Sequence, residues 1–103
     1  MLTEYELYRR QVDNISDRLK IELLKTWNGY DYYDNEYIKN NFNLHHLDPK
    51  YPTIDHKASV KYGYLNHIDE EIIADISNLC ITKRRINSSK RAKNEEYFNK
   101  QIK

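Results

Sequence analysis

The residues best suited to chemistry lie in the second half of the 103-residue chain, where Asp55-His56 is followed by Asn78 and Asn87. The imidazole of His56 has an ordinary pKa close to physiological pH, so it is a suitable general base for water. Asp55 and Asn87 offer hard oxygen ligands, which suit Mg²⁺ or Mn²⁺. A base and a divalent cation are what hydrolysis of a phosphodiester needs, together with stabilisation of the leaving oxygen. The residue types therefore indicate a one-metal hydrolytic site.

Strands and a helix must position these residues. The pattern predicts a strand over 52–58, a second strand over 79–82, and a loop between them that carries a short amphipathic helix at 68–76. A helix is predicted after the second strand, with residues 87–89 near its start. Neighbouring side chains on a strand point to opposite faces, so Asp55 and His56 need a bent or twisted strand end to address one phosphate.

This order and spacing resembles the HNH endonucleases, whose ββα-metal motif places an acid-His pair, then Asn-Leu, then an Asn or His followed by small polar residues and Lys. The matching residues, within a stretch from about 51 to 98, are Ile54-Asp55-His56, Asn78-Leu79 and Asn87-Ser88-Ser89-Lys90. The resemblance implies that His56 activates water, that Asp55 and Asn87 hold the cation, and that Asn78 orients the loop and the His56 imidazole. Small HNH nucleases often come from phages and mobile elements.

Many HNH domains also hold a structural zinc with two pairs of cysteines. In this chain those positions correspond to Asp31, Asp34, Lys83 and Ile86, and Cys80 is the single cysteine. Carboxylates, Lys and Ile do not form the tetrahedral thiolate site that structural zinc prefers. We therefore expect no structural zinc, an ion pair of Lys83 with Asp31 or Asp34, and Ile86 turned into the core.

Charge is distributed unevenly along the chain, although the net charge is only +1. Residues 83–103 carry eight basic and two acidic side chains, whereas residues 1–82 carry nine basic and fourteen acidic. The basic residues nearest Asn87 are predicted to contact phosphates that flank a cut, without reading sequence. They are Arg84, Arg85, Lys90, Arg91 and Lys93. DNA is the expected partner, and RNA is less favoured.

Residues 1–29 are predicted to form an N-terminal helical arm. Thr3 and Glu6 have the spacing of a capping box, and an apolar stripe follows at helical intervals. The stripe consists of Val12, Ile15, Leu19, Leu23 and Trp27. Such an arm could pack on the rest of the chain or form a homodimer. Residues 30–50 form a connecting segment rich in Tyr, in which His45-His46 favours a surface role over metal ligation.

Length and composition agree with one small α+β domain: a ββα-metal core at 51–103, preceded by the arm. Hydrophobic residues make up 39% and charged residues 32% of the chain, a balance typical of a folded protein with a small core. No stretch is apolar enough to cross a membrane, and a cytoplasmic protein is expected. Two other functions stay open: a catalytically inactive HNH-like module that binds nucleic acid or another macromolecule, and a purely structural domain.

Overall fold

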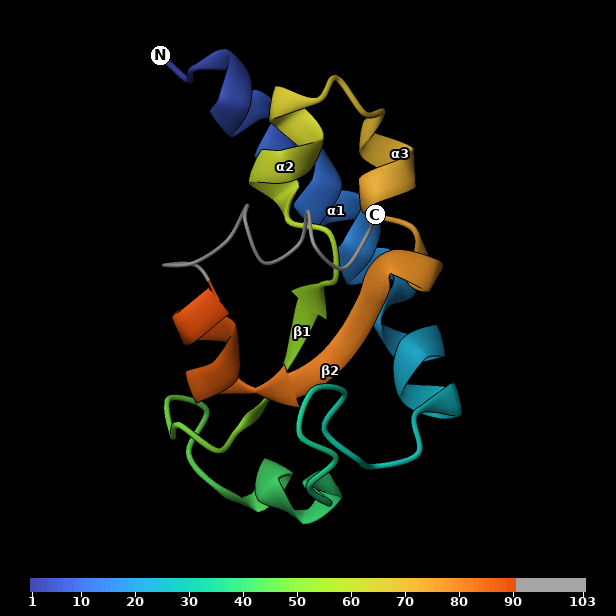
Figure 1. The fold of residues 1–103 in the computed structure, drawn as a ribbon, viewed down its shortest axis with the longest axis vertical. Helices are drawn as coiled ribbons and strands as arrows, with labels where there is room; N and C mark the ends of the chain where they lie inside the picture. The colour runs from blue at the N-terminus through green and yellow to red at the C-terminus, as the bar shows by residue number, and fades with distance from the viewer. Residues whose placement is uncertain (91–103) are drawn as a thin grey trace.

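The computed structural model describes residues 1–90, in which a long helix lies beside a small sheet (Figure 1). The helix is α1 (Glu4–Thr26), and the sheet consists of β1 (Pro52–His56) and β2 (Leu79–Lys83). The shorter elements are η1 (Lys39–Asn43), α2 (Val60–Leu65), α3 (Glu70–Ile73) and η2 (Ile76–Asn78), and helical residues 84–90 follow β2. The small α+β fold predicted from the sequence is confirmed.

The two strands are antiparallel, and the end of β1 pairs with the start of β2. Asp55 lies opposite Cys80 and His56 opposite Leu79. The helix begins directly after β2, at residue 84, because the backbone N–H of Arg84 donates to Tyr51 O at 2.9 Å and ties the turn to the segment before β1. The helix therefore begins about three residues earlier than predicted, and residue 87 lies one turn inside it.

The arm is an uninterrupted helix that forms part of the core. Thr3 and Glu6 make the predicted capping box, with each side chain bonded to the other residue's backbone N–H at 3.1 Å. The buried face of α1 carries Tyr8, Val12 and Ser16. The core cluster that this face completes consists of Tyr8, Val12, Val60, Ile73 and Ala74. The arm therefore packs against the rest of its own chain, while Leu7 and Ile21 stay exposed. The homodimer through the arm stays a prediction.

Helix α2 was not foreseen in the sequence, because Gly63 weakens a helical pattern. Ser59 starts the helix by accepting a hydrogen bond from Tyr62 N at 2.9 Å. Gly63 lets α1 approach: a Cβ there would lie 2.3 Å from Ile73 Cγ1 and 2.5 Å from the Tyr8 hydroxyl. That hydroxyl donates to Ile68 O at 2.7 Å, so α1 is fastened to the loop between the strands.

Hydrogen bonds and ion pairs of charged side chains join the connecting segment to β2. Asp31 is 1% exposed and accepts hydrogen bonds from Thr82 Oγ1 at 2.9 Å and from Lys83 N at 2.8 Å. The fully buried ammonium of Lys83 pairs with Asp34 and Glu36. Burial lowers the pKa of Lys83, but its hydrogen bonds with these two carboxylates outweigh that effect and raise the pKa.

The predicted pairing of Lys83 with Asp34 is thus confirmed, and Glu36 joins it. Ile86, expected in the core, is half-buried. His45 and His46 lie exposed in the connecting segment, with their rings stacked 4.4 Å apart between centroids. None of the described helices is long and apolar enough to cross a membrane.

We expect Lys83→Met to lower the free energy of unfolding by about 2 kcal/mol, because it removes a buried cation from two half-exposed carboxylates that solvent partly screens. Urea denaturation followed by circular dichroism measures the change. The matched control is Lys39→Met, since Lys39 is exposed in the same part of the structure. Equal midpoints for the two variants would show that the Lys83 ion pairs do not stabilise the fold.

Candidate functional site

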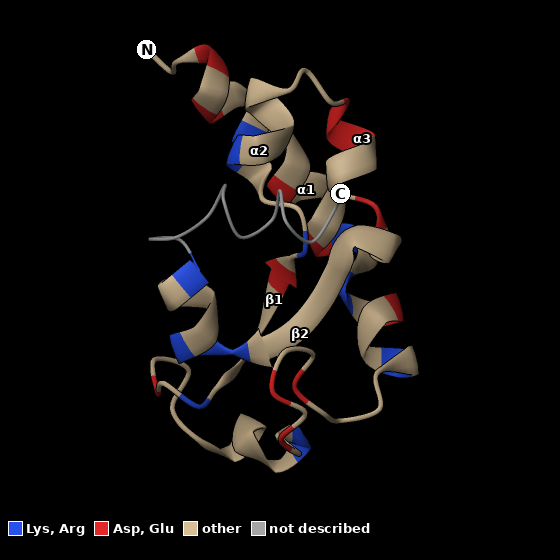
Figure 2. Cartoon of the chain, viewed as in Figure 1, with Lys and Arg blue, Asp and Glu red and all other residues tan. Residues whose placement is uncertain are grey.

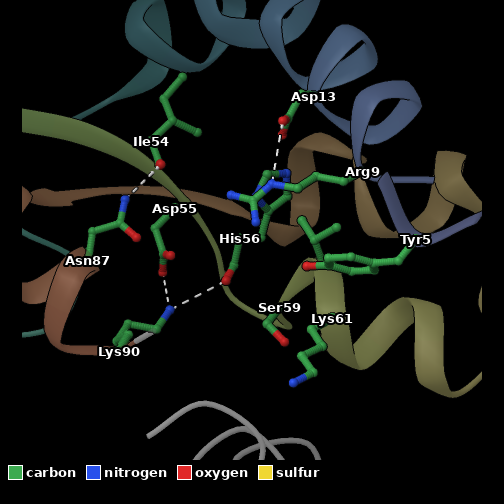
Figure 3. Close-up of a pocket in the computed structure, with 11 residues that line it drawn as sticks. Tyr5, Arg9, Asp13, Ile54, Asp55, His56, Ser59, Lys61, Asn87 and Lys90 are labelled. Carbon is green, nitrogen blue, oxygen red and sulfur yellow. Dashed lines mark hydrogen bonds and ion pairs between the residues drawn. The ribbon is translucent and has the colours of Figure 1, made fainter. Parts of the chain in front are cut away.

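A pocket of about 580 Å³ lies where α1, β1, α2 and the helix after β2 meet (Figure 3). Strand β1 supplies Asp55 and His56, and the helix supplies Asn87 and Lys90. The other charged or hydroxyl-bearing residues that line it are Tyr5, Arg9, Asp13, Ser59 and Lys61. The fold therefore brings together the predicted base and both predicted metal ligands, which are separated by up to 32 positions in the sequence.

His56 is held by the arm. Its Nε2 lies 2.8 Å from the hydroxyl of Ser16 on α1. Burial lowers the pKa of His56, and although Asp55 and Asp13 act in the opposite direction, the pKa stays below its ordinary value. The imidazole is therefore neutral at physiological pH. When Nε2 donates its proton to Ser16, Nδ1 carries the lone pair that can accept a proton from water.

Ser16 itself is placed to orient the imidazole and not to attack a substrate. It is 4% exposed, on the buried face of α1. A serine nucleophile must reach its substrate, and its histidine needs a third group to orient it. The Ser16 hydroxyl is shielded from the solvent, so the pair serves to fix one ring nitrogen of His56.

Asp55 is buried, and one of its carboxylate oxygens accepts hydrogen bonds from both Tyr33 and Lys90. Only 7% of the residue is exposed, and its Oδ2 accepts a hydrogen bond from the Tyr33 hydroxyl at 2.6 Å and from the ammonium of Lys90. Burial, followed by the bond to Asp55, raises the pKa of Tyr33, so this phenol stays protonated. Burial also raises the pKa of the neighbouring Cys80 thiol to about 12. Tyr33 and Cys80 therefore both stay neutral beside the Asp55 carboxylate.

Lys90 was expected to contact phosphates, and in this structure it does not point outward. Its ammonium binds Asp55 and lies 3.4 Å from His56 O (Figure 3). The physical reason is that a buried carboxylate needs a counter-charge. Burial lowers the pKa of Lys90, and the hydrogen bond with Asp55 offsets only part of that effect. A phosphate contact would require the ion pair to open.

The side-chain amide of Asn87 has a defined orientation. Its Nδ2 donates to Ile54 O at 3.1 Å and to Thr53 Oγ1 at 3.2 Å. Because a carbonyl oxygen can only accept, the amide nitrogen must face β1, and the amide oxygen turns toward Asp55 (Figure 3). The helix after β2 is thereby fixed to β1 by the residue that also offers an oxygen to the pocket.

The donors fit a water-rich Mg²⁺ or Mn²⁺ site and not a closed protein cage. Residues 1–90 contain no group of three or more His, Cys, Asp or Glu side chains that could hold a metal ion. Mg²⁺ commonly takes one or two carboxylates, several waters and substrate phosphate oxygens. Asp55 and Asn87 would be its protein ligands, but Asp55 shares the Oδ2 atom with the ammonium of Lys90.

Asn78 holds the loop, as predicted. Its Oδ1 accepts from Ala58 N at 2.8 Å, and its Nδ2 donates to Ala58 O at 3.0 Å and to Ile73 O at 2.7 Å. The chain just after β1 is thus fastened to the loop before β2. The Asn78 amide bonds Ala58 and Ile73, and Ser16 is the residue that bonds the His56 ring, so the predicted orientation of the imidazole by Asn78 would act through the backbone after β1.

Sequence reasoning missed the contribution of α1 to the pocket. Arg9, Asp13 and Ser16 follow one another at helical spacing, and this polar line beside the apolar stripe was the available signal. Arg9 Nε lies 3.8 Å from Asp13 Oδ2, and the guanidinium lies near His56 (Figure 3). Lys61 adds a second cation from α2.

The structure describes only some residues of the predicted basic surface. Lys and Arg residues, drawn in blue, lie at both ends of the helix after β2 (Figure 2). Arg85 is exposed and Arg84 is half-buried. Arg91 and Lys93, also predicted to contact phosphates, lie outside the described residues.

No family model, characterised protein or solved structure matches this chain. The resemblance to HNH endonucleases therefore depends on the motif residues and on their arrangement. The structure contains an antiparallel strand pair followed by a helix, with Asp55, His56 and Asn87 around one pocket.

The lowered pKa of His56 predicts a pH-dependent stability. The folded state favours neutral His56, so its contribution is complete above the ordinary pKa of about 6.5 and is lost as the pH falls through that value toward the lower pKa of the folded state. We expect wild-type Tm to fall more between pH 8 and pH 5 than the Tm of His56→Gln, whose amide can still bond Ser16. Exposed His46→Gln is the control and should follow the wild type. Parallel curves for all three would contradict the buried, neutral state of His56.

Proposed function

We propose that this chain is a metal-dependent nuclease of the HNH type that hydrolyses phosphodiester bonds in DNA. The observation that carries the proposal is the pocket in which β1 places Asp55 and His56 opposite Asn87 from the following helix. A base with a lowered pKa, two oxygen donors and nearby cations form a combination suited to phosphodiester hydrolysis. Nicking of one strand and cutting of both are equally compatible with it.

His56 has the central role in the reaction. Ser16 fixes one ring nitrogen, and the other accepts the proton of the attacking water. A divalent cation bound at Asp55 and Asn87 would neutralise charge on the scissile phosphate and on the leaving oxygen. Asn78 fastens the backbone that follows His56, two residues after the imidazole that Ser16 bonds.

The substrate backbone would lie across the cations at the rim of the pocket. Arg9 and Lys61 line the pocket from α1 and α2. Arg84 and Arg85 begin the helix after β2, outside the lining, and would meet phosphates farther along the backbone. Arginine and lysine bind phosphates without reading bases. The site is therefore suited to a DNA backbone of any sequence, and RNA is the less favoured substrate.

The second candidate is an inactive HNH-like module that binds nucleic acid or another macromolecule. The specific observation in its favour is the ion pair of Lys90 with Asp55, which neutralises a metal ligand. Such a module would keep its affinity for DNA when His56 is replaced. Turnover separates the two functions.

We expect the purified protein to convert supercoiled plasmid to open-circular or linear DNA with Mg²⁺ or Mn²⁺ and not with EDTA. His56→Ala should lower the rate about 10²- to 10⁴-fold, because the general base is lost. His46→Ala, an exposed histidine outside the pocket, is the matched control and should cleave at the wild-type rate. Unchanged cleavage by His56→Ala would exclude His56 as the base, and DNA binding without cleavage in any metal would favour the inactive module.

A second prediction concerns the arm. Arg9→Gln should weaken binding of a DNA duplex several-fold and reduce the slope of log K against log salt by about one, since one phosphate contact is lost. Fluorescence anisotropy at several salt concentrations measures both. Arg10→Gln removes the same charge from the adjacent position, which does not line the pocket, and should change binding less. Equal effects of the two variants would place the DNA away from Arg9.

A further inference from the structure

We propose that the ammonium of Lys90 occupies the place of the divalent cation and that the cation enters by displacing it. The inference rests on the metal site of the proposed function, namely on Asp55 and Asn87 as its ligands, and it adds a regulation of that site. Lys90 would then be a built-in competitor: the pocket is closed to metal while the ion pair stands, and it is open once the ammonium has moved away.

The first step of the argument is burial. The Asp55 side chain is 9% exposed and the Lys90 side chain 10% exposed, so the pair is largely removed from water. A buried carboxylate without a counter-charge is strongly destabilising. Asp55 therefore needs a cation at all times, and when no metal is bound Lys90 supplies it.

The second step is position. The ammonium lies against Asp55 Oδ2, near the Tyr33 hydroxyl, 3.4 Å from His56 O and 4.6 Å from the centre of the Tyr33 ring. These groups form a cage of oxygens and a π-face, the surroundings that suit a cation. The Asn87 amide oxygen turns toward the same carboxylate (Figure 3). The ammonium therefore lies at the carboxylate that a metal ion would have to bind.

The third step is exclusion. A divalent ion bound to Asp55 would stand a few ångströms from the ammonium, and like charges at that distance repel strongly in a partly buried site. The ammonium already occupies Asp55 Oδ2, and a divalent ion at either oxygen of this carboxylate would meet that repulsion. We therefore expect metal binding to break the ion pair, so that the affinity for metal is lowered by the free energy of that pair.

Mn²⁺ alone is the probe for the first test. Free Mn²⁺ is measured by electron paramagnetic resonance in titrations of wild type, Lys90→Met and Lys61→Met at pH 8. We expect Lys90→Met to bind Mn²⁺ about tenfold more tightly than wild type, because the competing ammonium is gone. Lys61→Met removes a pocket cation that has no ion pair with Asp55, and it should change the affinity much less. Equal or weaker binding by Lys90→Met, including no binding by either protein, would overturn the proposal.

A second measurement uses the wild-type protein and does not depend on a variant that folds. Lysines are methylated reductively with and without saturating Mg²⁺, and the rate at each position is followed by mass spectrometry. Lys90 should react several-fold faster with Mg²⁺, whereas exposed Lys61 should not change. An unchanged or slower reaction of Lys90 would overturn the proposal. Displacement of Lys90 by metal without any cleavage of DNA would refute the nuclease function and leave the displacement standing.

Discussion

A carboxylate removed from water must be given partners, and Asp55 obtains them from two separate parts of the chain. It stands on β1, accepts a hydrogen bond from Tyr33 in the connecting segment, and pairs with Lys90 on the helix after β2. The strand, the segment and the helix therefore meet at one oxygen atom. The position of Asn87 follows, because the helix that Lys90 anchors also brings this amide to the backbone of β1. The pocket is the space that these constraints leave beside His56.

The sequence predicted the elements with strong local signals. The capping box of Thr3 and Glu6 and the two short strands are local patterns, and the structure contains them. The loop-fastening role of Asn78 and the pairing of Lys83 with Asp34 were predicted from the resemblance to HNH endonucleases, and both contacts are present. That resemblance assigned positions across long separations, which no local pattern can do.

The features that the sequence did not predict depend on packing between distant segments. Ser16 meets His56 only because α1 packs beside the sheet, and nothing within α1 specifies that contact. Lys90 belongs to a run of basic residues that is typical of a solvated surface, and only the burial of Asp55 draws it inward. Helix α2 contains Gly63, which local helix propensity disfavours. Tyr8 and Ile73 pack so closely against it that a larger side chain would not fit.

The joint between the connecting segment and β2 is made of charged side chains. Asp34 and Glu36 lie about half in solvent, while the Lys83 ammonium between them is fully covered. In HNH domains that hold a structural zinc with cysteines, the corresponding joint depends on reduced thiols and on a supply of metal. Here its strength depends on ionic strength and on proton concentration instead, since salt screens the carboxylates and acid neutralises them. The joint is thereby independent of the redox state of its surroundings, and the divalent ion of the proposed nuclease would have no part in holding it together.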